Sequence, residues 1–353
     1  MTAISPRRLR RIVALSVAYS ATLVAFAAAP QASAMEVGVQ DTPVFVFQSY
    51  YNRVAALDKS KAFGANTLRI DMYWGDYRRH GFAPYDQTVD AARARGIRAQ
   101  ISLSGTPKYD PRGDRRISWR NPDVRQYAGW VGLVARHYKG KVRRYSIWSE
   151  PNQCYFLSRS SCSYTSRAVK QRIDIYRTLY RAGYASIKSS DRSAQVLIGE
   201  LSPINDPLGF LVAVVSSPAY RIVTDGFALH PYELASHRHV TGISSTPRIK
   251  GVLRSLARSG KLRTPRGGTP GLYYTELGYV RGYGGLRTEA QRARKTVAAL
   301  RYAKRQGVRQ VVYYHLVTPP RGFPRDPFPS AILSATGAAT ATYTELVRAR
   351  RSF

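Results

Sequence analysis

The chain has 353 residues, and its 55 lysine and arginine residues outnumber its 21 aspartate and glutamate residues, which gives a formal net charge of +34. Such a charge raises the local concentration of polyanions and speeds their capture. The basic residues are spread along the whole chain, with no single run and no recognisable nucleic-acid module, so we expect no nucleic-acid partner. An acidic glycan or the anionic cell envelope fits the charge better. An arginine-rich surface without a dedicated partner stays open as the alternative.

The first 34 residues have the organisation of a secretory signal peptide. Four arginines between positions 7 and 11 precede an apolar stretch from Ile12 to Ala29, and Ala32-Ser33-Ala34 supplies a cleavage site of small residues. The apolar stretch also has about the length of a membrane span, but the proline and glutamine before the cleavage site favour removal. No later stretch is long and apolar enough to span a bilayer. We therefore expect a secreted or cell-wall-associated protein without membrane contact after cleavage.

Residues 35–353, about 320 in number, have a length that suits one barrel domain as well as two smaller domains. The only two cysteines, Cys154 and Cys162, lie close together in a chain that we expect to be exported. A local disulfide is the default interpretation in that compartment, and two free thiols are the alternative. So short a loop would add little to global stability but would hold one wall of a cleft.

From residue 36 onward, strand-like and helix-like segments alternate along the chain. The expected strands are Glu36–Gln40, Thr67–Tyr73, Ile97–Leu103, Arg144–Ser149, Gln195–Gly199, Gly226–His230, Leu272–Thr275 and Gln310–Leu316. The expected helices are 52–63, 87–95, 121–138, 166–189, 207–217, 247–259, 288–306 and 336–350. Val44–Phe47 either extends the first strand or belongs to the loop after it.

Eight strand–helix units in this order indicate parallel βαβ units. In about 320 residues they predict an α/β fold, a closed (β/α)₈ TIM barrel with a single catalytic domain over residues 35–353. An open doubly wound sheet is the competing architecture. It would usually carry a glycine-rich phosphate loop after an early strand, and the sequence has none.

Two glutamates stand in matching positions, each directly after an expected buried strand. Glu150 follows Arg144–Ser149, and Glu276 follows Leu272–Thr275. A carboxylate there is costly to bury unless it is paired or useful, and an ion pair with one of the many arginines is the structural alternative for either alone. In a (β/α)₈ barrel, the carboxyl ends of all strands lie at the same end of the barrel, which is where active sites occur. Two carboxyl groups about 5–5.5 Å apart suit a retaining glycosidase, and about 6.5–9.5 Å an inverting one.

Three motifs resemble those of the retaining (β/α)₈ glycoside hydrolases of clan A, most closely families 39 and 5. Ile147-Trp-Ser-Glu-Pro-Asn152 looks like their Trp-Asn-Glu-Pro signature, and Tyr274-Thr-Glu-Leu-Gly-Tyr279 is similar to their strand-seven nucleophile segment. Phe227-Ala-Leu-His-Pro-Tyr232 resembles the His-x-Tyr region of strand six. The resemblance covers essentially the whole mature chain. It implies that Glu150 is the acid/base and Glu276 the nucleophile.

Further side chains are expected to face the same site. On Thr67–Tyr73, Arg69 and Asp71 alternate with Leu68 and Ile70, so we expect Arg69 to face the barrel axis and bind Glu276, with an internal pair to Asp71 as the alternative. His230 and Tyr232 share one face of a strand end. Tyr232 or Tyr274 is expected to donate a hydrogen bond to the nucleophile. His230 would bind substrate or orient a carboxylate, or serve as an ordinary structural histidine.

Aromatic and polar residues around the motifs complete the candidate substrate-binding set. Trp74 and Trp148 are candidate platforms for sugar rings, with core packing as the alternative for each. His315 stands near the position where the clan commonly carries a sugar-stacking tryptophan. Ser149 replaces the clan's usual asparagine, which binds the sugar 2-hydroxyl. It either acts through a water, suits a different 2-substituent, or weakens catalysis.

No metal-binding, redox or serine-hydrolase motif is present, so we expect no cofactor and no catalytic metal. His237-Arg-His239 is too isolated to form a metal site. The sequence therefore predicts a secreted glycosidase that cleaves O-glycosidic bonds of a polysaccharide with retention of configuration, and the charge favours an acidic substrate. The main alternative is a catalytically weakened barrel that binds glycans or the cell wall. A further alternative is an inverting hydrolase or a transglycosylase with the same fold.

Overall fold

The computed structural model describes residues 34–108, 119–219, 221–233, 240–282, 285–323 and 328–353. Residues 34–353 form one compact unit. The expected signal peptide, apart from its last residue, and the segment from His237 to His239 lie outside the described residues. No helix among the described ranges is long and apolar enough to cross a membrane.

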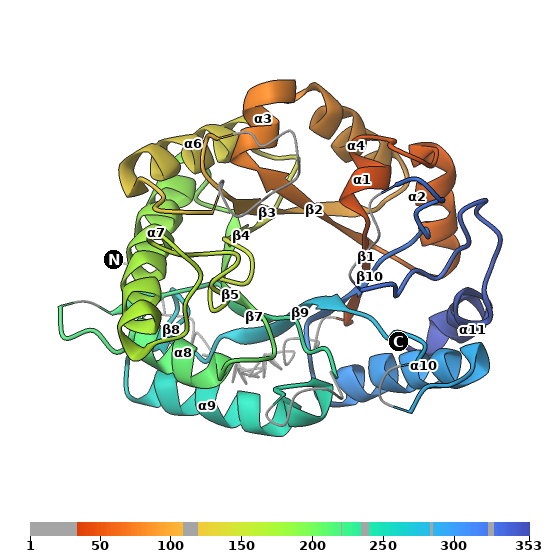
Figure 1. The fold of residues 1–353 in the computed structure, drawn as a ribbon. Coiled ribbons are helices and arrows are strands. Elements are labelled where there is room, and N and C mark those ends of the chain that lie inside the picture. The colour runs from red at the N-terminus through yellow and green to blue at the C-terminus, as the bar shows by residue number, and fades with distance from the viewer. Residues whose placement is uncertain (1–33, 109–118, 220, 234–239, 283–284, 324–327) are drawn as a thin grey trace, which may run out of the picture. The chain divides into compact units, whose positions relative to one another are not determined.

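Eight parallel strands close into a barrel in the order β1-β10-β9-β7-β5-β4-β3-β2 (Figure 1). The strands are β1 (Glu36–Gln40), β2 (Thr67–Tyr73), β3 (Arg98–Ser104), β4 (Arg144–Ile147), β5 (Gln195–Leu201), β7 (Gly226–Leu229), β9 (Gly271–Leu277) and β10 (Gln310–Tyr314). Each of them overlaps one expected strand, so the predicted TIM barrel is confirmed. A separate two-stranded sheet pairs β6 (Ile222–Val223) with β8 (Leu262–Arg263).

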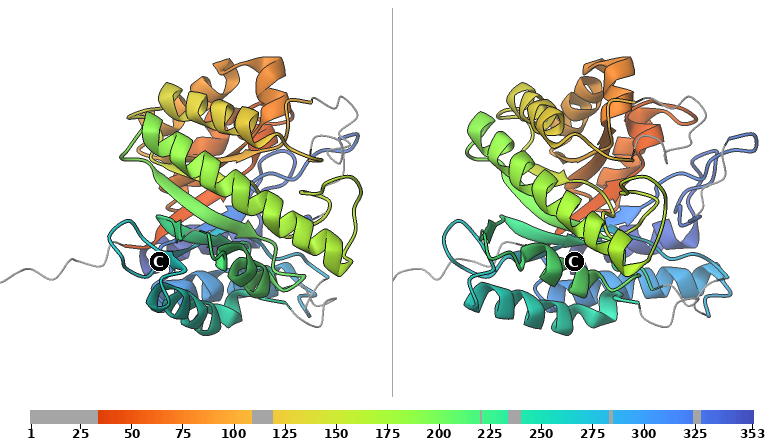
Figure 2. Two further views of the ribbon diagram at one scale, coloured as in Figure 1. Left: turned by 90° about the vertical axis from the view of Figure 1, so that its left-hand side faces the viewer. Right: turned by 60° about the vertical axis from the view of Figure 1, so that its left-hand side comes forward.

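Helices surround the barrel, as Figures 1 and 2 show. They are α1 (Thr42–Phe45), α2 (Arg53–Ala62), α3 (Trp74–His80), α4 (Ala83–Ala94), α6 (Val124–His137), α7 (Ser166–Ser190), α8 (Pro207–Val215), α9 (Thr246–Arg258), α10 (Glu289–Arg305) and α11 (Ala341–Ala349), with short 3₁₀ turns at Ile243–Ser245 and Arg350–Ser352. Side-chain caps start several of them. Thr288 and Gln291 form a capping box at α10, for example.

Two short helices were not predicted from the sequence. Val44–Phe47, expected either to extend the first strand or to belong to the loop after it, does not extend the strand, because α1 begins directly after β1 and Pro43 stands in its first turn. Proline suits that position, since its fixed φ is helical and its missing N–H would have no partner there. The short helix α3 was not expected at all. It follows β2 without a break, so the end of the strand gave no turn signal.

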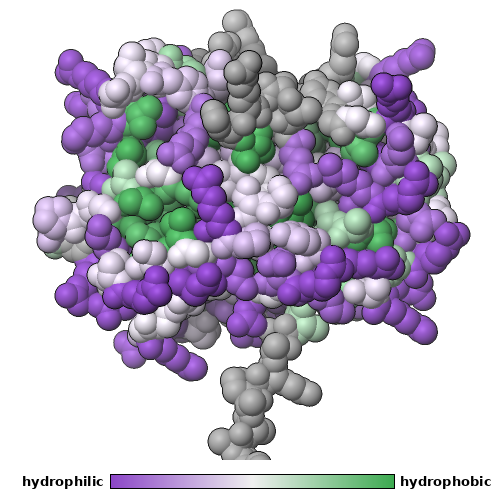
Figure 3. Space-filling model, turned by 90° about the horizontal axis from the view of Figure 1, so that it is seen from below, coloured by the Kyte–Doolittle hydropathy of each residue, from purple (hydrophilic) through white to green (hydrophobic). Residues whose placement is uncertain are grey.

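The strands bury their apolar side chains between the barrel and the helices. A second, smaller apolar cluster consists of Leu197, Ala228 and Tyr273, as expected for residues that face the barrel axis. The guanidinium of Arg144 lies 4.6 Å from the centre of the Tyr273 ring and binds Glu36 at the amino-terminal end of the barrel. The opposite end is left for a functional site. Hydrophilic side chains cover much of the side that carries α9 and α10 (Figure 3), in keeping with the basic composition.

Candidate active site

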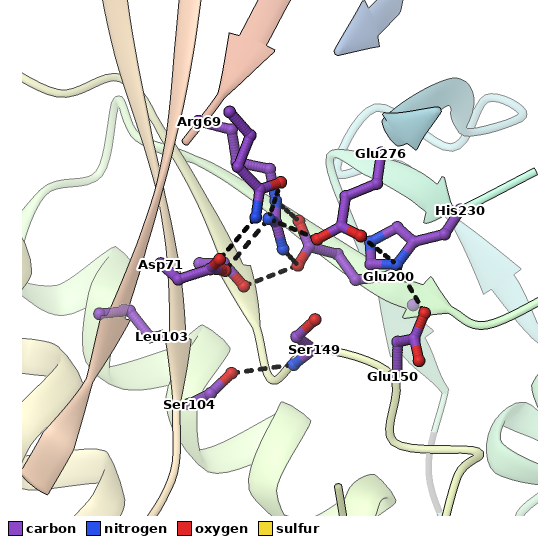
Figure 4. Close-up of polar contacts among 12 residues, drawn as sticks. Arg69, Asp71, Leu103, Ser104, Ser149, Glu150, Glu200, His230 and Glu276 are labelled. Atoms are coloured by element: carbon purple, nitrogen blue, oxygen red, sulfur yellow. Dashed lines mark hydrogen bonds and ion pairs between the residues drawn. The ribbon is translucent and has the colours of Figure 1, made fainter. Parts of the chain in front are cut away.

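Arg69 of β2 lies at the centre of a buried ion-pair network inside the barrel (Figure 4). Its Nη1 lies 2.8 Å from Glu276 Oε1 and 3.1 Å from Asp71 Oδ1. Its Nε and Nη2 donate to Glu200 Oε1 and Oε2 at 3.0 and 2.6 Å. Burial alone would lower the pKa of Arg69, but Asp71, Glu200 and Glu276 raise it well above its usual value. The predicted inward orientation is confirmed, and both expected partners are present.

A β-bulge in β9 turns Glu276 toward Arg69. Tyr274 lies opposite Val311 of β10, whereas Leu277 lies opposite Tyr313, so β9 has one extra residue. Because strand side chains alternate with period two, the extra residue reverses the faces beyond it. Tyr274 therefore points away from the axis, where its hydroxyl bonds to Thr246 of α9. Of the two tyrosines expected as alternative donors to the nucleophile, Tyr274 is for this reason not the donor, and Tyr232 is.

A second bulge, in β5, brings in a carboxylate that the sequence analysis missed. Gly199 and Leu201 lie opposite consecutive residues of β7, and Glu200 between them has φ of 47°, a left-handed conformation that glutamate seldom adopts. Glu200 is fully buried and accepts a 2.6 Å hydrogen bond from Ser102. Burial raises the pKa of Glu200, but Arg69 and Ser102 outweigh it and hold the pKa below its usual value.

Glu150 lies in the loop that follows β4. Its backbone has φ of 47°, and its N–H donates to the carbonyl of Glu200 at 2.8 Å, which ties the loop to β5. The side chain is 17% exposed, and its Oε1 lies 3.0 Å from His230 Nδ1. Burial raises the pKa of Glu150 above its usual value, His230 opposes this shift, and the charge of Glu276 adds to it. A raised pKa is what a general acid needs near neutral pH.

His230 and Tyr232 connect the two glutamates. His230 is fully buried, and its Nδ1 lies 3.0 Å from Glu150 Oε1 and 3.4 Å from Glu276 Oε2. Burial lowers the pKa of His230, but the two carboxylates reverse the shift and raise it. The Tyr232 hydroxyl donates to Glu276 Oε2 at 2.9 Å. One ligand-type atom from each of Glu150, His230 and Glu276 lies within 4.8 Å of the others. Since Arg69 and Tyr232 already partner Glu276, the cluster needs no metal to account for it.

Ser149 and His315 lie close to this network. The N–H of Ser149 donates to Ser104 Oγ at 2.9 Å, and its side chain points toward the carboxylates (Figure 4). His315 directly follows β10 and is near enough to the fully buried Asp41 to oppose the rise that burial causes in the Asp41 pKa. Both residues occupy the expected places at the barrel mouth. Their roles toward a sugar stay predictions.

The two tryptophans do not offer faces to a ligand. Trp74 is only 9% exposed, and its ring stacks flat on Trp130 of α6, with 5.3 Å between ring centres. Trp148 is fully buried, and its Nε1 donates to the Phe156 carbonyl at 2.7 Å. Trp119 also packs against Trp148, edge to face. Core packing was the correct alternative for both, so the proposed sugar platforms at these positions were wrong.

The loop after Glu150 is held rigidly against the barrel. Cys154 and Cys162 form the expected disulfide. The buried Arg172 of α7 donates to the carbonyls of Leu157 and Ser163 at 2.9 and 2.6 Å. Hydrogen bonds from Asn152 to two carbonyls after β5, at 2.9 and 3.0 Å, fix the start of the loop. The loop is thus a preformed wall beside the acid/base candidate.

The sequence matches no protein-family model. The structure is similar to a family 39 glycoside hydrolase from Bacteroides cellulosilyticus WH2 (TM-score 0.66, 16% identity, 89% of this chain and 62% of that one). It is also similar to a monomeric beta-xylosidase from Caulobacter crescentus CB15 (0.63, 18%, 89% and 66%). It is also similar to a GH5_18 protein from Streptomyces cattleya, solved with GlcNAc, with a TM-score of 0.60 and 15% identity over 90% of this chain and 80% of that one. The chain thus spans less than two thirds of the first two proteins, and at these identities it shares their fold.

Proposed function

We propose that this protein is a retaining glycosidase whose catalytic pair is Glu150 and Glu276. The observation that carries the proposal is the meeting of the two carboxylates at one buried histidine. Their nearest oxygens and His230 Nδ1 lie within 4.8 Å of one another. This proximity supports the close carboxyl pair of a retaining enzyme, about 5–5.5 Å apart, over the wider separation of about 6.5–9.5 Å in an inverting one.

The environments of the two glutamates support different roles. Glu276 accepts hydrogen bonds from Arg69 and Tyr232, which favour the ionised form that a nucleophile requires. Among the described residues, Glu150 has no cation in direct contact apart from His230, and its pKa is raised. A carboxylate bound by two donors beside a carboxyl group with a raised pKa is the arrangement expected of a nucleophile and an acid.

The reaction then proceeds in two displacements. Glu276 attacks the anomeric carbon while Glu150 gives its proton to the leaving oxygen, and the C–O bond to the leaving group breaks. The ester of Glu276 carries no charge, so the pKa of Glu150 falls and its carboxylate takes a proton from water. The resulting hydroxide attacks the anomeric carbon, the ester bond breaks and Glu276 is released as a carboxylate. Both inversions together retain the configuration.

The substrate class is a glycan, and the chain's charge favours an acidic one. The proteins with similar folds include a beta-xylosidase and one solved with GlcNAc, so a pyranose ring suits barrels of this type. The net charge of +34 would raise the concentration of polyanions around the protein. Export by the N-terminal signal would place the enzyme where such polymers occur. The glycan-binding alternative rests on Ser149, whose single hydroxyl replaces an amide, and on His315, which stands near the position of a sugar-stacking tryptophan in the clan.

A screen of neutral and acidic polysaccharides with the wild-type protein tests the proposal, with Glu276→Gly and Glu150→Gln as matched variants. We expect hydrolysis by the wild type, a loss of at least about 10⁴-fold in either variant, and rescue of Glu276→Gly by azide with an inverted glycosyl azide as product. Full activity of Glu276→Gly without azide would contradict the nucleophile assignment. Binding without hydrolysis of any polymer would favour the glycan-binding alternative.

A further inference from the structure

Glu200 is a buried carboxylate to which the proposed reaction gives no step. Four carboxylates lie in the network, contributed by Asp71, Glu150, Glu200 and Glu276, and they share two cationic groups, Arg69 and His230. Glu200 is the only one of the four that makes two hydrogen bonds to Arg69. It is also fully buried, so this charge is kept in the site at a cost that only its partners offset.

The two hydrogen bonds from Arg69 to Glu200 determine which guanidinium nitrogen is left to bind the nucleophile. The two oxygens of Glu200 take Nε and Nη2, while Nη1 remains for Glu276, Asp71 and Gln40. A bidentate pair holds the guanidinium plane in one orientation. The strained backbone of Glu200 and the hydrogen bond from Ser102 hold the carboxylate itself. The position of the Nη1–Glu276 contact therefore depends on Glu200.

We propose that Glu200 is a positioning residue that orients Arg69 toward Glu276 and, through its negative charge, sets the pH range over which the site is active. The proposal rests on the function proposed above. Arg69 is shared among three carboxylates, so Glu276 receives only part of its charge.

The sign of the effect follows from electrostatics. A negative charge inside a buried cluster makes every neighbouring group hold its proton more tightly, so removal of that charge lowers the proton affinity of each group. The charged or titratable groups around Glu200 come from several elements. Arg69 of β2, His230 after β7, Tyr127 of α6 and Tyr176 of α7 interact with it directly. Asp71 of β2, Glu276 of β9 and Glu150 after β4 are linked to it through Arg69 or His230.

The first test is the pH dependence of kcat/KM for Glu200→Gln, which keeps the shape and removes the charge. We expect both limbs of the bell-shaped profile to move to lower pH, by on the order of one unit. Glu200→Asp keeps the charge but is too short for both hydrogen bonds to Arg69, so it should lower kcat and leave the limbs in place. Glu36→Gln is the matched control, because it removes a carboxylate that binds Arg144 at the other end of the barrel. Its limbs should not move.

A second readout needs no substrate. The His230 ring, followed by NMR during a pH titration, should titrate at lower pH in Glu200→Gln than in the wild type and in Glu36→Gln. This result would stand even if no glycan were hydrolysed, so it separates the role of Glu200 from the proposed function. Unmoved limbs and an unmoved His230 titration in a folded Glu200→Gln protein would overturn the proposal. An equal shift in Glu36→Gln would do the same, and Glu200→Asp covers the case in which Glu200→Gln does not fold.

Discussion

Replacement of Arg69 by methionine should destabilise the protein strongly at neutral pH and much less at acid pH. Arg69 is fully buried and is an ion-pair partner of Asp71, Glu200 and Glu276. Methionine has a similar length, so it leaves little cavity, but it leaves the carboxylates without their cation. Removal of one partner from a single buried pair costs about 3–5 kcal/mol, and we expect at least that loss at pH 7.5.

The dependence on pH follows from the sign of the pKa shifts. In the wild type, the pKa of Glu200 is lower folded than unfolded, so its contribution to stability is present above the unfolded value of about 4.3 and is lost as pH falls through the folded pKa. Without Arg69, burial raises the same pKa above the unfolded value. The ionised, buried Glu200 then destabilises the variant at pH values above the folded pKa of Glu200. The stability of the variant recovers as pH falls below that pKa and Glu200 becomes protonated. Both effects reduce the difference between the two proteins toward acid pH.

Urea unfolding followed by tryptophan fluorescence at pH 7.5 and pH 4.5 measures this difference. Arg144→Met is the control, since Arg144 pairs with the single carboxylate of Glu36 and is partly exposed. We expect a smaller loss there, with less dependence on pH. A loss below about 1 kcal/mol in Arg69→Met at pH 7.5, or the same loss at both pH values, would refute the electrostatic account of the network.

Three further predictions concern single contacts. Tyr232→Phe removes the hydroxyl that donates to Glu276, so it should lower kcat about 10- to 100-fold with little change in KM. An unchanged kcat in steady-state assays would contradict that role. Trp148→Ala should lower the free energy of unfolding in urea by about 3–5 kcal/mol, because Trp148 is fully buried. Tyr155→Ala, at a 57% exposed position, should lower it by less than about 0.5 kcal/mol, and similar losses in both variants would contradict the difference in burial. Replacement of Cys154 and Cys162 by serine should lower stability by no more than about 2–3 kcal/mol, because the loop spans only 8 positions, and a larger loss would give the loop a global role.

The barrel could be predicted because its pattern is regular along the chain. Buried strands and amphipathic helices alternate along the chain. Most strands and helices begin and end within a few residues of the positions expected from the sequence. The orientation of Arg69 also followed from alternation, since Leu68 and Ile70 on either side face the helices and are fully buried.

The orientation of side chains could not be predicted where the strands depart from regular alternation. The bulge in β5 changes the face of Glu200, and the bulge in β9 places Glu276 on the face opposite to Tyr274; neither bulge has a proline or a turn motif that marks it. Gly199 directly before Glu200 was the only local signal. Glu200 directly follows the expected strand Gln195–Gly199, so the criterion used for Glu150 and Glu276, a carboxylate directly after a buried strand, applied to it as well and was overlooked there. Trp74 could not be assigned, because its partner Trp130 lies on a helix far along the chain.

The most direct test of the catalytic pair is covalent trapping of the glycosyl-enzyme. The protein is incubated with a panel of 2-deoxy-2-fluoro glycosyl fluorides, and the labelled peptide is identified by mass spectrometry. The account predicts one label per chain on Glu276, slow release in buffer, and no label in Glu276→Gln. A label on Glu200 or on Glu150, or hydrolysis of the parent glycoside with inverted product, would contradict it.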